Sequence, residues 1–228
     1  MSSQSWEREY ANPSFITKNT RPQEDFLKFL QWLKKIKNDA LTSLQVLDLG
    51  CGIGRNSLYL ANKYHVKVTA IDFSKNAIRL AKEHFSHENI HFVVDSISEP
   101  FPLEDESVGL VLDIMSSFSL TEVEREKYLQ EINRVLKSGG FMYVRTLKKE
   151  ADKNAGYLLK NNPGKEKDTY IHPTLGSHER VFSELDFREL YTKYFDIVKM
   201  QGKSGYQKFD GQPYKRNYWN VYLQKKNV

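Results

Sequence analysis

The residues of this sequence best suited to bind a ligand follow a short apolar run. Asp48 lies within that run, and Gly50, Gly52 and Gly54 come directly after it. Glycines let a backbone turn sharply and approach a ligand closely, and the helix predicted to follow offers unpaired N–H groups at its start. A dinucleotide-binding loop has a further glycine three positions after Gly52, where this chain has Arg55. The pattern therefore predicts a ligand-binding loop, but the missing glycine is evidence against pyrophosphate as its ligand.

Two carboxylates end the next two predicted strands. Asp72 stands 22 positions after Gly50, where a carboxylate can accept hydrogen bonds from both hydroxyls of a ribose. Asp95 ends the following strand and could reach an adenine amine. Because ligands of open α/β sheets bind at the carboxyl ends of the strands, these features together predict an adenosine-shaped site. Singly, Asp72 could be a helix N-cap, Asp95 a turn residue and the glycines an ordinary turn.

These motifs resemble those of the class I S-adenosylmethionine-dependent methyltransferases. The resemblance covers about residues 45–146 and rests on Asp48-x-Gly50-x-Gly52-x-Gly54, Asp72, Asp95 and the run Leu136-Lys137-Ser138-Gly139-Gly140 before a strand. The stretch 54–61 is also similar to the tellurite-resistance and thiopurine-type branch, which acts on small molecules.

The resemblance implies that the chain binds S-adenosylmethionine and releases S-adenosylhomocysteine, with no metal. Asp72 would bind the ribose, Phe73 would lie against the adenine, and Asp113 would line the cleft near the sulfonium, followed by Met115. Cys51 is expected to be a small residue filling the loop, not a nucleophile. The residues that would contact the cofactor are Asp48, Gly50, Cys51, Gly52, Asp72, Phe73, Asp95, Ser96, Ile97 and Asp113.

The residues expected to bind the methyl acceptor come from three segments. They are Tyr10 in an N-terminal arm, Ser117 after the fourth strand, and Tyr170 and His172 in a polar insertion at about 148–180. An aromatic and imidazole lid suits a small planar or amine substrate, and the alternative is a solvated excursion with packed tyrosines. No Asn/Asp-Pro-Pro-aromatic run follows the fourth strand, which disfavours methylation of DNA base amines. No catalytic base is identified.

The elements that must position these residues alternate between strand and helix. We expect strands at 45–49, 66–71, 90–94, 108–113 and 141–146, and helices at 55–64, 74–85 and 122–136. This order predicts an α/β fold: a Rossmann-like class I methyltransferase sheet with helices on both faces.

The ends of the chain depart from this alternation. Residues 1–21 are expected to be irregular, and Gly139-Gly140 to end a helix. After a helix at 183–193, two strands at 195–200 and 218–223 are expected to flank a basic loop at 202–217, the last strand being antiparallel. We expect an N-terminal arm and helix over 1–40 and a single methyltransferase domain over 41–228 with its substrate-side insertion at 148–180.

Charge and composition limit the partners. The 228 residues carry a net charge of +5, and from Lys199 onward there are seven basic residues against one acid. This basic segment also holds aromatic residues, which can stack on RNA bases, or can alternate into the sheet while lysines protect an exposed edge. The single cysteine and the absence of a long apolar run indicate a cytoplasmic protein without a membrane span. A zinc site at His84, His87 and His91 is disfavoured.

Three functions remain after these considerations. The first is direct in-line methyl transfer to a small molecule, indicated by the stretch 54–61 and the lid-like insertion. The second is methylation of RNA, either tRNA or rRNA, indicated by the basic C-terminal segment; nucleic acid is the less favoured partner. The third is a non-catalytic S-adenosylmethionine-binding protein, whose glycine loop would look the same. The oligomeric state is not specified by these patterns.

Overall fold

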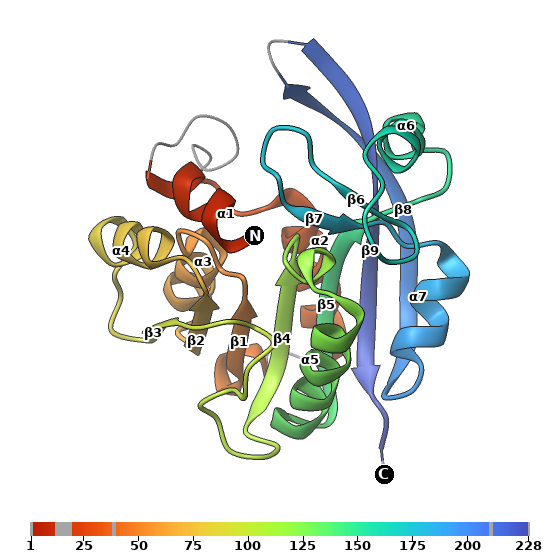
Figure 1. Cartoon of the computed structure of the whole chain (residues 1–228). Helices are drawn as coiled ribbons and strands as arrows, with labels where there is room; N and C mark the ends of the chain where they lie inside the picture. The colour runs from red at the N-terminus through yellow and green to blue at the C-terminus, as the bar shows by residue number, and fades with distance from the viewer. Residues whose placement is uncertain (1, 12–19, 38–39, 210–211, 228) are drawn as a thin grey trace.

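A central sheet of seven strands organises the molecule (Figure 1). The computed structural model of the chain describes residues 2–11, 20–37, 40–209 and 212–227. The strand order is β3-β2-β1-β4-β5-β9-β8, with the first five parallel and β9 antiparallel to both of its neighbours. The predicted α/β sheet with an antiparallel last strand is therefore confirmed. The strands are β1 Gln45–Leu49, β2 Lys67–Asp72, β3 Ile90–Val94, β4 Val108–Ile114, β5 Leu136–Leu147, β8 Phe195–Phe209 and β9 Gln212–Lys225.

Helices cover both faces of this sheet (Figure 1). Buried residues of α2 (Glu24–Lys37), α3 (Arg55–Tyr64) and α4 (Lys75–His84) form one apolar cluster with the sheet. Buried residues of α5 (Glu122–Val135) and α7 (Glu184–Tyr191) form the other. The central strand β4 is buried along almost its whole length because it is covered from both sides.

Local capping explains where several of these helices begin. The Ser74 side chain accepts a hydrogen bond from the Ala77 N–H at 3.0 Å, as predicted for the start of α4. A capping box formed by Thr121 and Glu124 starts α5. These caps place the first turns of both helices beside the carboxyl ends of the strands.

The N-terminal segment is more ordered than its sequence indicates. Residues 1–21 were expected to be irregular; residues 1 and 12–19 lie outside the described ranges, but α1 (Ser2–Ala11) is a helix packed against α4. The Glu7 carboxylate accepts hydrogen bonds from the Ser74 hydroxyl and the Asn76 N–H, and the Glu7 carbonyl accepts one from the Asn76 amide. Tertiary contact, and not local propensity, therefore stabilises this helix.

Two further expectations about the chain were wrong. Gly139-Gly140 do not end α5 before a strand; α5 ends at Val135 and the glycines lie within β5, where Gly139 has φ +67°. Most of the stretch 202–217 is strand and not loop: outside residues 210–211, which lie outside the described ranges, β8 and β9 pair from Phe195 with Lys225 to Phe209 with Gln212, with a register shift between Ile197 and Lys199. Gly202 lies within this ladder. A Cβ at this position would contact the Lys148 ammonium, and the Trp219 ring is close by.

The insertion after β5 is a folded unit. It contains α6 (Lys153–Asn161) and an antiparallel pair of short strands, β6 (Thr169–Ile171) and β7 (His178–Arg180). The β7 strand packs against the turn Ser117–Ser119 that follows β4. The insertion therefore adjoins the loop on which part of the candidate site depends.

A buried polar network fastens the insertion to β9. The Arg216 guanidinium, 3% exposed, donates to the Tyr170 hydroxyl at 2.8 Å and its Nε lies 3.3 Å from the Asp152 carboxylate. The Tyr170 hydroxyl in turn donates to Glu179, which also accepts from Ser177. Arg216 is thus a structural cation and not a surface contact for RNA.

No helix in the described ranges is long and apolar enough to cross a membrane. Those same ranges contain no group of three or more His, Cys, Asp or Glu residues that could hold a metal ion.

Replacing Arg216 by Leu should lower the free energy of unfolding by about 3–5 kcal/mol, because Asp152 and Glu179 would stay buried without their cation. Equilibrium urea denaturation followed by tryptophan fluorescence measures the change. The exposed neighbour Lys215→Gln is the control and should change stability by less than about 0.5 kcal/mol. Equal effects of the two substitutions would contradict the structural role of Arg216.

Candidate functional site

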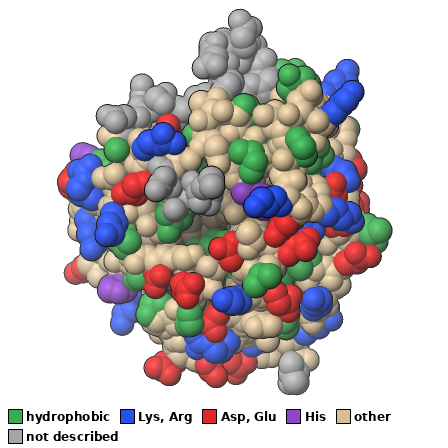
Figure 2. Space-filling model, viewed as in Figure 1, with side chains coloured by type: hydrophobic (Ala, Val, Ile, Leu, Met, Phe, Trp, Pro, Cys, Tyr) green, Lys and Arg blue, Asp and Glu red, His purple; other side chains and the backbone are tan. Residues whose placement is uncertain are grey.

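The glycine loop lies at the carboxyl end of β1, where this face of the molecule is hollowed next to α1 (Figure 2). Gly50, Gly52 and Gly54 have φ values of +67°, +56° and +82°, which other residues rarely adopt. A Cβ on Gly50 would lie 2.3 Å from the Ser116 Cβ, so the loops after β1 and β4 are in close contact. Glycine is therefore required at these positions by the positive φ of the backbone and, at Gly50, also by the close contact with Ser116.

The N–H groups of this loop point into the protein. Those of Gly50 and Cys51 donate to the Ile71 carbonyl at 2.8 and 3.0 Å, and that of Gly52 donates to the Asp72 carboxylate at 2.9 Å. The Gly54 N–H donates to the Cys51 carbonyl at 3.0 Å. Phosphate-binding loops direct such N–H groups at the ligand, so this loop is not built to hold a phosphate.

Asp72 joins the glycine loop to α4. One carboxylate oxygen accepts from Gly52 and the other from the Ser74 N–H at 2.9 Å. A carboxylate has about four acceptor sites, so roughly two remain for the hydroxyls of a ligand. The N-cap of α4 is Ser74, so Asp72 does not have the N-cap role that the sequence left open; it accepts the N–H of the cap residue and keeps acceptor sites for a ribose.

Asp48 lies beneath the loop in the middle of β1. Its carboxylate accepts a hydrogen bond from the Ser57 hydroxyl at 2.6 Å, which ties β1 to the first turn of α3. Burial raises the pKa of Asp48 to about 6, with a further contribution from the charge of Asp72. Burial likewise raises the pKa of Asp72 to about 6. Burial also raises the pKa of the Cys51 thiol, which agrees with a packing role.

The expected adenine contacts line up after β2 and β3. Phe73 is 39% exposed directly after Asp72, so its ring is accessible to a ligand. Asp95 is exposed, its N–H donates to the Asp72 carbonyl, and its carboxylate accepts from the Ser96 N–H. Ile97 is buried in the adjoining core. The structure therefore brings these residues together beside Asp72.

Asp113 is fully buried, and its carboxylate accepts hydrogen bonds from groups of the protein. Its carboxylate accepts from the Tyr128 hydroxyl at 2.6 Å, from the Ser116 hydroxyl at 2.5 Å and from the Ser117 N–H at 3.2 Å. These bonds hold Met115 at a φ of +63°, a strained conformation of the kind that gathers at functional sites. In this structure the Asp113 side chain shapes the loop after β4, and Met115 is half-buried in the bend, packed against the core.

Tyr10 reaches the glycine loop from α1. Its hydroxyl lies 2.6 Å from the position that a Cβ on Gly52 would take. Burial, and then the charge of Asp72, raise the pKa of Tyr10 well above its usual value. The structure therefore places this residue, which is distant in sequence, over the glycine loop.

The other three expected acceptor residues are buried. The Ser117 hydroxyl lies in the turn beneath the insertion and has no hydrogen-bond partner in the described chain. The Tyr170 hydroxyl belongs to the network with Arg216. The His172 ring accepts hydrogen bonds from the N–H groups of Thr174 and Leu175, and burial lowers its pKa. Tyr170 and His172 thus stabilise the insertion from inside.

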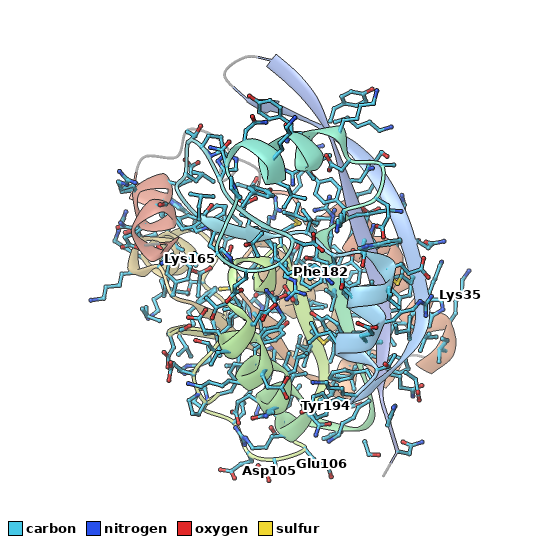
Figure 3. All side chains as sticks on the ribbon, turned by 45° about the vertical axis from the view of Figure 1, so that its right-hand side comes forward. Lys35, Asp105, Glu106, Lys165, Phe182 and Tyr194 are labelled. Carbon is cyan, nitrogen blue, oxygen red and sulfur yellow. The ribbon has the colours of Figure 1, made fainter. Side chains whose placement is uncertain are left out.

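The insertion meets the sheet at Phe182, which lies between the insertion and the helices α5 and α7 (Figure 3). The Phe182 carbonyl accepts from the Trp219 indole at 2.9 Å. The guanidinium groups of Arg125 and Arg180 lie 5.0 and 5.1 Å from its ring centre. This contact holds β7 against the turn after β4.

Two arginines near the site were missed at the sequence level. Arg55 opens α3, whose N-terminus has no side-chain cap, next to Tyr10 and the glycine loop. Arg145 lies near the end of β5, level with Ile114 of β4. The signal for Arg145 was available, since it is the one charged residue in the buried run 141–147.

Comparison with known proteins agrees with this architecture. A family described as "Methyltransferase domain" matches residues 46–140. A SAM-dependent methyltransferase structure from Methanosarcina mazei superposes with a TM-score of 0.72 at 25% identity, over 85% of this chain and 98% of that one. The TehB structure from Haemophilus influenzae superposes with a TM-score of 0.63 at 19% identity, over 99% of this chain and 67% of that one, which shows a shared fold.

The curated relatives include methyltransferases whose names give different substrates. The sarcosine/dimethylglycine N-methyltransferase of Halorhodospira halochloris is 37% identical over 98 residues, 42% of this chain and 34% of that protein. The 2-heptyl-1-hydroxyquinolin-4(1H)-one methyltransferase of Mycobacteroides abscessus is 28% identical over 194 residues, 84% of this chain and 73% of that protein. The chain spans only a third to under a half of the first three curated relatives it matches.

Replacing Gly50 by Ala should abolish binding to the loop and destabilise the protein, because the new methyl group would collide with Ser116 at a left-handed position. Calorimetry with S-adenosylhomocysteine and thermal melting measure the two effects. Gly156→Ala is the matched control: a Cβ there meets nothing within 4 Å, and alanine in a helix should stabilise by about 0.5–1 kcal/mol. Unchanged binding by the Gly50 variant would contradict the close contact.

The buried acids should make stability depend on pH. Their folded pKa values, about 6, lie above the unfolded value, so the native state binds more protons between pH 4 and 6. Stability should therefore fall as the pH rises through this window, by up to about 1.4 kcal/mol per pH unit for each group. Asp48→Asn should remove the contribution of Asp48 to this pH dependence. In urea denaturation, the free energy of unfolding should therefore fall less between pH 4.5 and 6.5 in the variant than in the parent. Identical losses would refute this.

Proposed function

Because this chain carries a class I S-adenosylmethionine-dependent methyltransferase domain, we propose that it transfers the methyl group of S-adenosylmethionine to a small-molecule acceptor. The observation that carries this proposal is the orientation of the glycine loop. Its N–H groups are used inside the protein, which suits a ligand without phosphates, while Asp72 keeps acceptor sites beside it. An adenosine joined to an amino acid fits this arrangement; a dinucleotide does not.

The cofactor would be held by the residues that the site gathers. We assign the ribose to Asp72, the adenine to Phe73, Asp95, Ser96 and Ile97, and the methionine part to Gly50, Cys51 and Gly52. The uncapped N-terminus of α3 with Arg55 suits the methionine carboxylate, because a helix start favours negative charge. Asp48 supports the loop from below through Ser57.

The chain contributes positioning to the reaction. When bound, the cofactor's sulfonium makes its methyl carbon electrophilic, so an acceptor in line with the carbon–sulfur bond can displace it. Tyr10 lies over Gly52 and shields the loop from water, and Met115 forms the bend after β4 where the acceptor would enter. Alignment of this kind can lower a barrier by on the order of 7–11 kcal/mol.

A small acceptor is favoured over RNA. The relatives named above act, by their names, on sarcosine or dimethylglycine and on a hydroxyquinolinone. Two of the basic residues that pointed to RNA are structural: Arg216 holds the insertion, and Lys225 is buried against the Leu136 and Asn133 carbonyls. We further propose the division into a 1–40 arm and a 41–228 domain, and a cytoplasmic setting that suits a single buried thiol.

Calorimetry with S-adenosylhomocysteine tests the cofactor assignment. The parent should bind, and Asp72→Ala should bind about 10- to 100-fold more weakly, because two hydrogen bonds to a charged group are lost. Asp105→Asn is the control, since this exposed residue lies at the far end of the molecule from the insertion (Figure 3). Absence of binding by the parent would overturn the function.

Transfer of labelled methyl groups tests the acceptor class. With a cell extract, the label should appear in the dialysable fraction and not in RNA. Label in the RNA fraction would favour RNA over a small molecule as the methyl acceptor. If the parent binds S-adenosylhomocysteine but labels neither fraction, the non-catalytic function is supported instead.

A further inference from the structure

Arg145 is a buried cation at the acceptor end of the site. It lies on β5 beside Ile114, one position beyond the level of Leu49 and Asp113, and its carbonyl accepts the N–H of Met115. Its side chain is 13% exposed. Arg145 is therefore adjacent to the strained bend after β4 and lies across β4 from the glycine loop.

The guanidinium of Arg145 is fixed in place, but its hydrogen-bonding capacity is not fully used. It stacks on Tyr218, with 3.7 Å between the guanidinium carbon and the ring centre. Its buried Nε has no hydrogen-bond partner in the described part of the chain. A rigidly held guanidinium whose Nε makes no hydrogen bond is suited to bind a planar anion, since the fork of an arginine matches a carboxylate or phosphate.

The nearest carboxylate does not fill this role. Asp25 lies 3.8 Å from the Arg145 Nε, beyond hydrogen-bond distance, and accepts instead from Lys203 at 2.5 Å. Lys28 lies 3.9 Å from the same carboxylate and pairs with Glu24 at 2.7 Å. Two acids thus face three cations, and Arg145 is the cation whose ion pair with Asp25 is too long for a hydrogen bond.

A second guanidinium lies within electrostatic reach. Burial, and repulsion by Arg145, both lower the pKa of Arg55. Two arginines converging at the carboxyl ends of the strands are unfavourable unless anions lie between or beside them. Asp25 is the carboxylate that lies beside Arg145, and because this ion pair at 3.8 Å is not hydrogen-bonded, the guanidinium can bind a closer anion.

We propose that Arg145 recognises an oxyanion, a carboxylate or a phosphate, on the methyl acceptor, so that the substrate of this enzyme is an anionic small molecule. This inference rests on the proposed methyl transfer, whose cofactor half is tested separately by S-adenosylhomocysteine binding. Tyr218 would provide the aromatic floor beneath the anion. Asp25 and Lys203 would close the far side of the site.

The charge of the product gives the first test. Extract incubated with the parent and labelled S-adenosylmethionine should yield a small labelled product that an anion-exchange resin retains at neutral pH. A product that flows through the resin overturns the proposal while leaving methyl transfer intact.

The second test separates the acceptor's anion from the cofactor's carboxylate. Arg145→Gln should lower kcat/KM for the isolated acceptor at least 30-fold, mainly through KM, with the Kd of S-adenosylhomocysteine unchanged within twofold. Arg145→Lys should recover part of the loss. Lys67→Gln, which removes an exposed cation at the start of β2, at the opposite end of the parallel strands from Arg145, is the control and should change nothing. A parallel loss of S-adenosylhomocysteine binding in Arg145→Gln would overturn the assignment to the acceptor.

A binding measurement covers the case in which no product forms. Benzoate and inorganic phosphate are titrated into the S-adenosylhomocysteine complex of the parent and of Arg145→Gln, and thermal melting checks that both proteins are folded. Binding of either anion by the parent that is lost in the variant supports the oxyanion site. Absence of binding by the parent, or equal binding by both proteins, refutes it.

Discussion

The carboxylate of Asp72 is the interaction on which the site depends. With its two oxygens it fixes the Gly52 N–H of one loop and the Ser74 N–H at the start of α4. Because it is buried and its charge is costly there, these two donors are what keep it in place. The same residue is the one expected to bind the ribose, so the group that shapes the loop also faces the ligand.

The N-terminal helix extends this arrangement. Glu7 accepts hydrogen bonds at the start of α4, where Ser74 is already the cap, and Tyr10 comes to lie over Gly52 from the same helix. A residue far from the loop in sequence is thereby held against it. The acids beneath the loop and the arginines around it give the site a negative centre and a positive rim, which suits a ligand with an ammonium, a carboxylate and ribose hydroxyls.

The insertion shapes the site from the other side. Its polar residues are engaged in holding it to β9, and Phe182 fixes it over α5 through two arginines. Its strand β7 rests on the turn after β4, whose geometry Asp113 and Tyr128 set. Diversity of acceptors on one fold is expected to arise in such segments, since loops and insertions vary while the scaffold beneath them is kept.

The sequence by itself determined the order of strands and helices from β1 to α5 and the position of the glycine loop. These features depend on periodicity, on glycines that need positive φ, and on caps such as Ser74, all of which act between near neighbours. It did not determine the helix α1, the long β8–β9 ladder or the position of Gly139 inside β5, because these depend on pairing with distant segments. Nor could it show that Tyr170, His172 and Arg216 are turned inward, or that Arg145 lies beside the bend after β4. Which polar groups find partners and which stay unsatisfied is decided only when the tertiary structure brings distant charges together.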